Sequence, residues 1–188
     1  MGELLRQIRP RVGVPLIAAG GIGDSASIRD AQSAGADVIA CGTAFLAAEE
    51  ADVHPVYLTR LIEAEPADTV LTTLFDGGWP HAPHRVIINP TYATWQAAGR
   101  PAPGSRPGEG EPVATRGGHR VLRYDDSQPT RDTVGDAALM ALYAGTSVRA
   151  IRGPEPAAAI VKRLAARLWS EPHAGASFRN TGPAQGLN

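Results

Sequence analysis

Near the start of the chain, two nearly continuous apolar runs flank a segment with helical spacing. The runs are VPLIAAGG at 14–21 and DVIACGTAF at 37–45. Between them, Asp24 or Ser25 is suited to cap a short helix, and Gly35 is suited to end it. Strands that are apolar throughout are typical of a parallel sheet covered on both faces. The pattern therefore predicts one βαβ unit in an α/β fold.

Further patterns predict the elements on either side of this unit. Helices are expected over residues 3–9, with Leu4, Leu5 and Ile8 inward, and near 55–65, with Leu58, Leu61 and Ile62 inward. DTVLTTLF and RVIIN predict two strands joined by a turn, and a helix should follow from Asn89 through Trp95 to Ala98. This middle region informs mainly about the organisation of the chain.

The remaining segments predict a loop, two helices and a tail. Residues 99–118 are rich in Gly and Pro and are expected to form a long surface loop. DAALMALYAGTSV predicts a compact helix that ends at Gly145, with Leu139, Leu142 and Tyr143 inward. PEPAAAIVKRLAARLW predicts the last helix, with this buried stripe: Ala157, Ile160, Val161, Leu164 and Leu168. Residues 170–188 lack periodicity, which predicts a disordered tail.

Composition narrows the class of protein. The chain has 188 residues, 43% hydrophobic content and a formal charge of −1, which favours one ordinary core and argues against a nucleic-acid surface. No apolar run approaches the ~20 residues of a membrane span, and no secretory signal is present, so we expect a cytoplasmic location and no membrane partner. The single cysteine, Cys41, is expected to be a buried strand thiol rather than a reactive one.

Both predicted strands end in glycine, at the edge of a parallel sheet where ligands bind. Backbone N–H groups can hold a phosphate only where the main chain approaches closely and turns freely, and Gly20–Gly21 before a helix start provides both. Gly42–Thr43 would add an amide and a hydroxyl. The alternative is that Gly20 and Gly21 only make a tight turn. The dinucleotide spacing G-x-G-x-x-G is absent from GGIGDS.

The histidines offer no clear catalytic or metal site. His81 and His84 form HAPH, but Pro80 and Pro83 predict a loop there, and no carboxylate or cysteine nearby completes a metal site. We therefore interpret them as solvated loop residues and predict no metal centre.

VPLIAAGGIGD and AGADVIACGTAFLAAEEA together resemble the seventh and eighth strand segments of the nitronate monooxygenase family, which are FMN-dependent (β/α)8 barrels. DTVLTTLFDGGWPHAPHRV and GDAALMALYAGTSVRAI resemble the family's C-terminal elaboration. The similarity covers roughly residues 3 to 169. It implies the C-terminal part of an FMN-binding TIM barrel with a helical, loop-rich appendage.

The resemblance implies particular cofactor contacts. Gly20 and Gly21 match the family's first phosphate loop, Gly42 and Thr43 match the second, and Ala19 matches a weaker backbone contact. Flavin-ring contacts are not carried over, because Ala40, Cys41 and Ala44 replace residues common in the family. Trp79 and Trp95 could stack on the flavin ring, but core packing is the simpler interpretation.

The resemblance also implies an absence. The family's catalytic histidine lies upstream of the seventh strand, and no histidine precedes Val14 here. Strands one to six are missing as well, since a full barrel needs ~250 residues. We therefore expect residues 1–50 to hold the last βα units with the phosphate loops, and residues 51–169 to hold the elaboration and closing helices. No catalytic residue is assigned, and the chain alone is expected to be inactive.

The implied reaction is oxidation of alkyl nitronates by O2 through FMN. Two alternatives remain open: a fragment of an FMN-dependent enoyl reductase barrel, and a non-catalytic phosphate-binding or interaction fragment. Because a partial barrel exposes strand edges, self-association or a complementary half-barrel is also expected.

Overall fold

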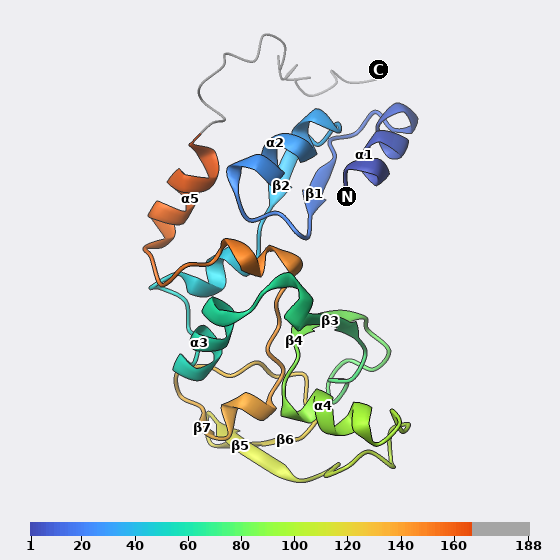
Figure 1. Cartoon of the computed structure of the whole chain (residues 1–188), viewed down its shortest axis with the longest axis vertical. Helices are drawn as coiled ribbons and strands as arrows, with labels where there is room; N and C mark the ends of the chain where they lie inside the picture. Colours follow the sequence, from blue (N-terminus) through green and yellow to red (C-terminus); the bar gives the residue numbers. More distant parts are fainter. Residues whose placement is uncertain (167–188) are drawn as a thin grey trace, which may run out of the picture.

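The computed structural model describes residues 1–166, and the predicted βαβ unit forms near the N-terminus (Figure 1). Strands β1 (Ile17–Ala19) and β2 (Val38–Ala40) pair in parallel, with Ile17 opposite Val38. Helix α2 (Ser25–Ser33) connects them, and α1 (Gly2–Ile8) with a short 3-10 turn (Arg9–Arg11) precedes them. The α/β prediction is confirmed, although this part of the chain forms only a two-stranded parallel sheet.

A capping box fixes the start of α2. The Asp24 carboxylate accepts a hydrogen bond of 2.8 Å from the Ser27 backbone N–H, and Ser27 Oγ accepts one of 3.2 Å from the Asp24 backbone N–H. Each side chain thereby satisfies an N–H group that the first helical turn leaves unpaired. Gly35, with φ of +106°, lies just beyond the other end of the helix. The predicted cap and stop residues are confirmed.

The second strand is shorter than predicted, and its cysteine lies outside it. β2 ends at Ala40, and the chain turns at Gly42 into a 3-10 helix over Thr43–Ala47. Cys41 is therefore a half-buried residue of the loop after the strand, not a buried strand thiol. Partial burial raises the pKa of its thiol, so it is not an activated nucleophile.

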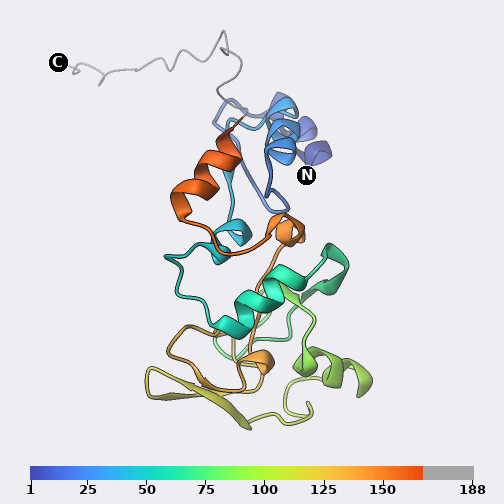
Figure 2. The same ribbon diagram turned by 60° about the vertical axis from the view of Figure 1, so that its left-hand side comes forward.

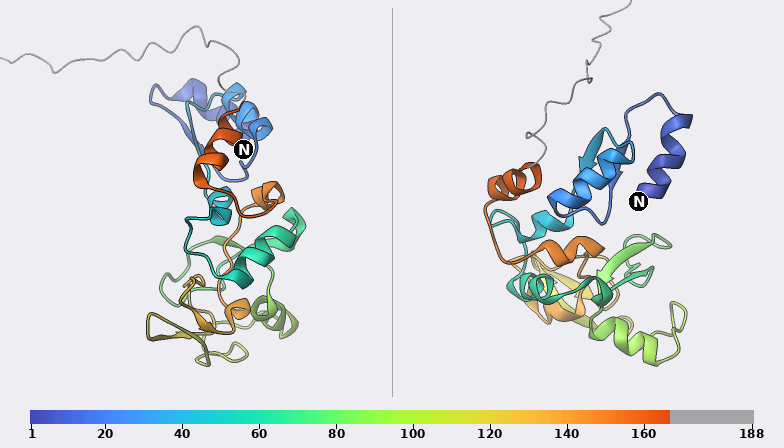
Figure 3. Two further views of the ribbon diagram at one scale, coloured as in Figure 1. Left: turned by 90° about the vertical axis from the view of Figure 1, so that its left-hand side faces the viewer. Right: turned by 45° about the horizontal axis from the view of Figure 1, so that its top comes forward.

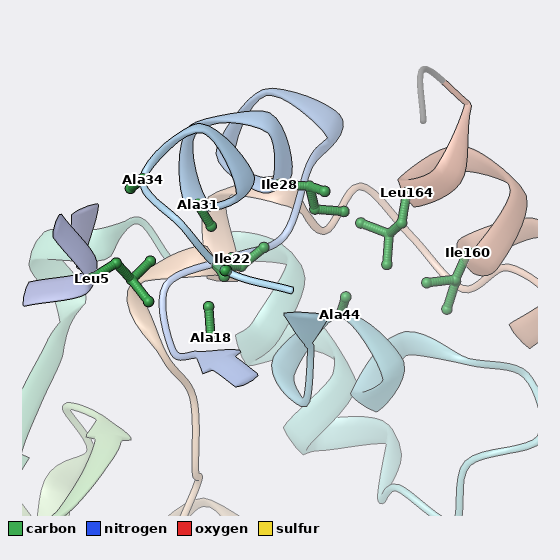
Figure 4. Packing of buried hydrophobic residues seen from close by; sticks show 10 residues of the cluster. Leu5, Ala18, Ile22, Ile28, Ala31, Ala34, Ala44, Ile160 and Leu164 are labelled. Carbon is green, nitrogen blue, oxygen red and sulfur yellow. The ribbon is translucent and has the colours of Figure 1, made fainter. Parts of the chain in front are cut away.

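The last helix, α5 (Ala157–Ala165), packs against the βαβ unit (Figure 2). Figure 4 shows Ile160 and Leu164 of α5 pointing toward Ile28 of α2 and Ala44 of the turn after β2. Ile160 and Leu164 are buried as predicted, whereas Val161 is exposed because it lies on the outer side of the helix. Leu168 lies outside the described residues.

The second half of the molecule carries the predicted middle elements (Figure 1). Helix α3 (Pro55–Glu63) is followed by a 3-10 turn (Pro66–Asp68), the antiparallel pair β3 (Thr69–Thr72) and β4 (His84–Ile87), and α4 (Pro90–Ala97). The inward face of α3 differs slightly from the prediction: Tyr57 and Leu61 are buried, whereas Ile62 is exposed.

The region predicted as a long surface loop, 99–118, ends in the first strand and the turn of a β-hairpin. Strands β5 (Pro112–Arg116) and β6 (His119–Leu122) pair antiparallel, and β7 (Val134–Gly135) joins the other edge of β5. Figure 3 shows this hairpin at the opposite end of the molecule from α1. Gly117 and Gly118 both have positive φ, +55° and +80°, as the two-residue turns that match strand twist require. The overall Gly and Pro content obscured this local Gly-Gly hairpin pattern.

The helix predicted over 136–145 is wrong. Only Ala137–Leu139 and Thr146–Ala150 form short 3-10 turns, and the chain between them is extended. It lies beside β4: the Ile87 N–H donates to the Leu142 carbonyl at 2.8 Å, and the Ala144 N–H donates to the Arg85 carbonyl at 3.0 Å. Pairing with an existing strand satisfies the backbone, so tertiary context overrides helix propensity here.

Within residues 1–166, no helix combines the length and hydropathy that a bilayer span would need. The predicted tail at 170–188 falls outside the described residues.

Candidate functional site

Three loops from distant parts of the sequence meet beside the end of β1. The first contains Gly21, the second Thr43 and the third Gly145–Thr146. The Gly145 backbone N–H donates a hydrogen bond of 2.9 Å to Thr43 Oγ1. A Cβ built on Gly145 would lie 4.0 Å from the Gly21 backbone nitrogen. The two glycine loops predicted from the sequence are therefore joined by a third one.

A cavity of about 610 Å³ opens beside these loops. Its wall includes Gly20 and Gly21, whereas Ala19, Gly42 and Thr43 are not part of the wall. Thr43 lies behind the wall, where its Oγ1 accepts a hydrogen bond from the Gly145 N–H. The remaining wall residues are Met1, Gly2, Ile22, Ser27, Asp30, Ala31, Arg85, Gly145 and Thr146.

The backbone at Gly20 and Gly21 requires glycine. Their φ angles are +95° and +73°, a region that side chains rarely allow. A Cβ on Gly21 would also lie 3.1 Å from Thr146 Oγ1. Gly42 differs, because its φ is −103° and a Cβ there would meet no atom within 4 Å. Of the two predicted loops, only the first therefore needs glycine for its backbone conformation.

The donors around the cavity suit an anion. Behind the wall, Thr43 Oγ1 accepts the Gly145 N–H, which holds the third loop against the second. Arg85 of β4 brings a positive charge to the wall. Consecutive backbone amides in a left-handed turn form a concavity that binds phosphate groups. The residues present therefore fit a phosphate group, such as the one that the expected cofactor would carry.

Sequence reasoning missed the third loop and Arg85. Gly145–Thr146 was assigned to the end of a helix, although AGTS repeats the Gly-Thr pair found at Gly42–Thr43. This repeated Gly-Thr pair was the feature of the sequence that could have indicated the third loop. Arg85 carried no comparable motif, because only the tertiary fold brings this residue of β4 to the cavity wall beside Gly20 and Gly21.

A second cavity, of about 370 Å³, lies beside the β3–β4 turn and is lined by Trp79, His81, His84, Asp126 and Tyr143, among others. Trp79 is 72% exposed, so it is not core packing. Trp95, by contrast, packs on the buried Tyr92, which confirms core packing at that position.

His84 is not a solvated loop residue. It belongs to β4, and its ring meets the Tyr143 ring edge-on, with centroids 5.5 Å apart. Its Nδ1 lies 2.9 Å from the Ala82 carbonyl oxygen, so Nδ1 carries the proton in the neutral ring. Burial raises the pKa of Tyr143 to about 12. His81 is exposed, as predicted. Within residues 1–166, no three potential ligands among His, Cys, Asp and Glu gather as a metal site would require.

Comparison with known proteins gives a consistent result. The family model described as nitronate monooxygenase matches residues 1–167. A probable nitronate monooxygenase of Bacillus subtilis is 43% identical over 74 residues, which is 39% of this chain and 21% of that protein. The nitronate monooxygenase npaC of Metarhizium robertsii is 31% identical over 159 residues, which is 80% of this chain and 40% of that protein.

Two solved structures share the fold over most of the described chain. Nitroalkane oxidase from Streptomyces ansochromogenes is 32% identical with a TM-score of 0.63, over 89% of this chain and 43% of that one. FabK from Thermotoga maritima is 26% identical with a TM-score of 0.62, over 87% of this chain and 47% of that one. The chain therefore spans less than half the length of these relatives.

Proposed function

Because the chain belongs to the nitronate monooxygenase family, we propose that it works as part of a flavin-dependent oxidoreductase that oxidises alkyl nitronates with O2. On this proposal, residues 1–50 hold the last βα units of a partial TIM barrel, and residues 51–169 form the elaboration and closing helices. FMN supplies the redox chemistry when it is bound. This chain supplies the site for its phosphate.

The cofactor site is the meeting point of the glycine loops. The Gly20 and Gly21 amides approach the phosphate directly, Ala19 adds a backbone contact, and Gly42 and Thr43 form the second loop. The observation that carries this proposal is the positive φ of Gly20 and Gly21 at the cavity wall, +95° and +73°. Such a turn exposes adjacent N–H groups to one anion.

The chain's own residues bind the cofactor but do not perform the proton transfer. None of the residues lining the glycine-loop cavity is a histidine, and His84 has its ring nitrogens directed to backbone atoms of Ala82 and Phe75. A neutral nitroalkane, unlike its nitronate, must lose a proton before it is oxidised, and on this proposal the base that takes the proton lies outside this cavity. A complementary half-barrel would supply it.

Titration of the purified 188-residue chain with FMN, followed by quenching of flavin fluorescence, tests this proposal. We expect saturable quenching that is weaker with riboflavin, which lacks the phosphate. Absence of any FMN binding would contradict the proposal. With propyl nitronate and FMN, an oxygen electrode should register no enzymatic turnover from this chain alone, whereas a rate above ~1 per second would place the catalyst within these residues.

The second candidate function is that of an FMN-dependent enoyl reductase fragment, and the similarity to FabK from Thermotoga maritima favours it. A complementary half assayed together with this chain distinguishes the two functions. Nitronate-dependent oxygen uptake supports the first, and NAD(P)H-dependent enoyl reduction supports the second. FMN binding with neither activity would instead support a non-catalytic phosphate-binding fragment.

A further inference from the structure

Arg85 lies on β4, where side chains alternate between the two faces of the strand. Neighbouring residues of β4 therefore have different surroundings. Its neighbour His84 lines the aromatic cavity beside the β3–β4 turn, whereas Arg85 lines the glycine-loop cavity together with Gly20 and Gly21. Successive side chains of a strand point to opposite faces. The strand thus directs one guanidinium toward the glycine loops from the far half of the molecule.

The guanidinium of Arg85 has no negatively charged partner within residues 1–166. Its Nη1 donates to the Thr69 carbonyl oxygen and to Thr69 Oγ1, each at 3.2 Å. Both acceptors are neutral, and the described ion pairs of the chain involve other arginines. Since a guanidinium carries five N–H donors, those on Nη2 and Nε remain for a ligand.

Thr69 holds the Arg85 side chain in place. Thr69 is buried, and its hydroxyl donates a hydrogen bond of 2.9 Å to the Pro66 carbonyl while it accepts from Arg85. The guanidinium is therefore positioned before any ligand arrives, which reduces the entropy lost on binding. Asp30 is the other charged side chain that lines the cavity, and it is exposed on α2.

We propose that Arg85 is a phosphate-binding residue of this cavity and that it sets the preference for a phosphorylated flavin over riboflavin. The inference rests on the proposed function, because the anion is taken to be the FMN phosphate. A guanidinium recognises phosphate through two parallel N–H···O bonds, which are stronger than bonds from neutral donors. Backbone amides from the first loop and Arg85 from β4 would then hold the phosphate between them.

Titrations of FMN and riboflavin into wild-type, Arg85→Gln and Arg85→Lys chains test the proposal. Arg85→Gln should weaken FMN binding by about 10- to 100-fold and leave riboflavin binding unchanged. Arg85→Lys keeps the charge but loses the planar fork, so an intermediate loss is expected. Arg60→Gln is the matched control, because Arg60 also donates to a backbone carbonyl, that of Ile88 at 3.1 Å, but does not line the cavity.

The outcomes separate this inference from the proposed function. If wild-type protein prefers FMN and Arg85→Gln retains the same preference, the inference is overturned while the proposed function stands. If wild-type protein binds no FMN, both fall. Should Arg85→Gln fail to fold by circular dichroism, Arg85→Lys decides: weaker FMN binding with unchanged riboflavin binding supports the role, and unchanged FMN binding overturns it.

Discussion

The backbone N–H of Gly145 donates a hydrogen bond of 2.9 Å to Thr43 Oγ1, which joins two loops that are 102 positions apart in the sequence. Thr43 follows the second strand of the βαβ unit, and Gly145 belongs to the extended segment beside β4. One contact therefore ties the predicted phosphate loops to the C-terminal elaboration. Arg85, Gly145 and Thr146 also line the glycine-loop cavity, so this region contributes to the wall of the proposed site.

Replacing Thr43 with valine should weaken both the fold and the cofactor site. The substitution keeps the side chain's shape but leaves the partly buried Gly145 N–H without its acceptor, which costs about 1–3 kcal/mol. For a chain of 188 residues, each kcal/mol corresponds to a fall in Tm of roughly 2–4 °C. Differential scanning calorimetry measures it. Thr43→Ser keeps the hydroxyl and should retain most of the stability, so equal losses in both variants would argue against the hydrogen bond.

The two glycine loops should respond differently to a side chain. Gly21→Val combines a backbone at φ +73° with a Cβ that lies 3.1 Å from Thr146 Oγ1, and we expect flavin binding to be lost. Gly42→Ala introduces a methyl group into open space at an ordinary φ of −103°. It should leave the Tm and the flavin affinity near their wild-type values. Unchanged yellow colour and fluorescence quenching in Gly21→Val protein would contradict the assignment of this loop.

The sequence predicted those parts of the site that depend on local pattern. Apolar strands, the Asp24 cap and the Gly20–Gly21 turn are each encoded within a few neighbouring residues, so periodicity and turn chemistry were sufficient. Arg85 and Gly145 reach the cavity only through tertiary contacts. The apolar residues of the segment that carries Gly145 have helical spacing. The segment is nevertheless extended, because it pairs with β4. A sequence pattern indicates the helix or strand propensity of a segment, but it does not indicate which strand lies beside that segment in the fold.

The cap at Asp24 should make stability depend on pH. Its hydrogen bond from the Ser27 backbone N–H is the largest of the causes that hold the pKa of this carboxyl below its ordinary value of 3.8. A lowered pKa in the folded state means that the contribution is present above pH ~4 and is lost as the pH falls through 3.8 and below. Asp24→Ala should cost about 1 kcal/mol at pH 7.

Thermal denaturation of wild-type and Asp24→Ala proteins between pH 7 and pH 2.5 measures this dependence. The difference in Tm should be largest at neutral pH and should narrow toward the acid end. Asp24→Asn is the control, since the amide oxygen still caps the helix but does not titrate. A constant difference between wild-type and Asp24→Ala proteins at every pH would show that the charge of the carboxylate contributes nothing.

The last prediction concerns the two strands of the βαβ unit. Ile17 and Val38 lie opposite each other in the β1–β2 register, and they are 65% and 47% exposed. Within residues 1–166, each of these strands has only the other as its partner, so each presents an unpaired edge. Exposed apolar strands with free edges are a template for pairing with another chain. We therefore expect the isolated chain to self-associate, or to be captured by a complementary half-barrel.

Light scattering coupled to size-exclusion chromatography measures this association. Wild-type protein should elute above the chain mass of 19.6 kDa, and the double variant Ile17→Lys, Val38→Lys should shift toward the monomer because charged side chains disfavour edge pairing. Leu71→Lys is the control, since Leu71 is also an exposed apolar strand residue but belongs to the separate β3–β4 pair. A monodisperse wild-type monomer with a cooperative thermal transition would overturn this expectation. An equal shift in the Leu71→Lys protein would instead place the contact elsewhere, because a lysine on β3 leaves the β1 and β2 edges unchanged.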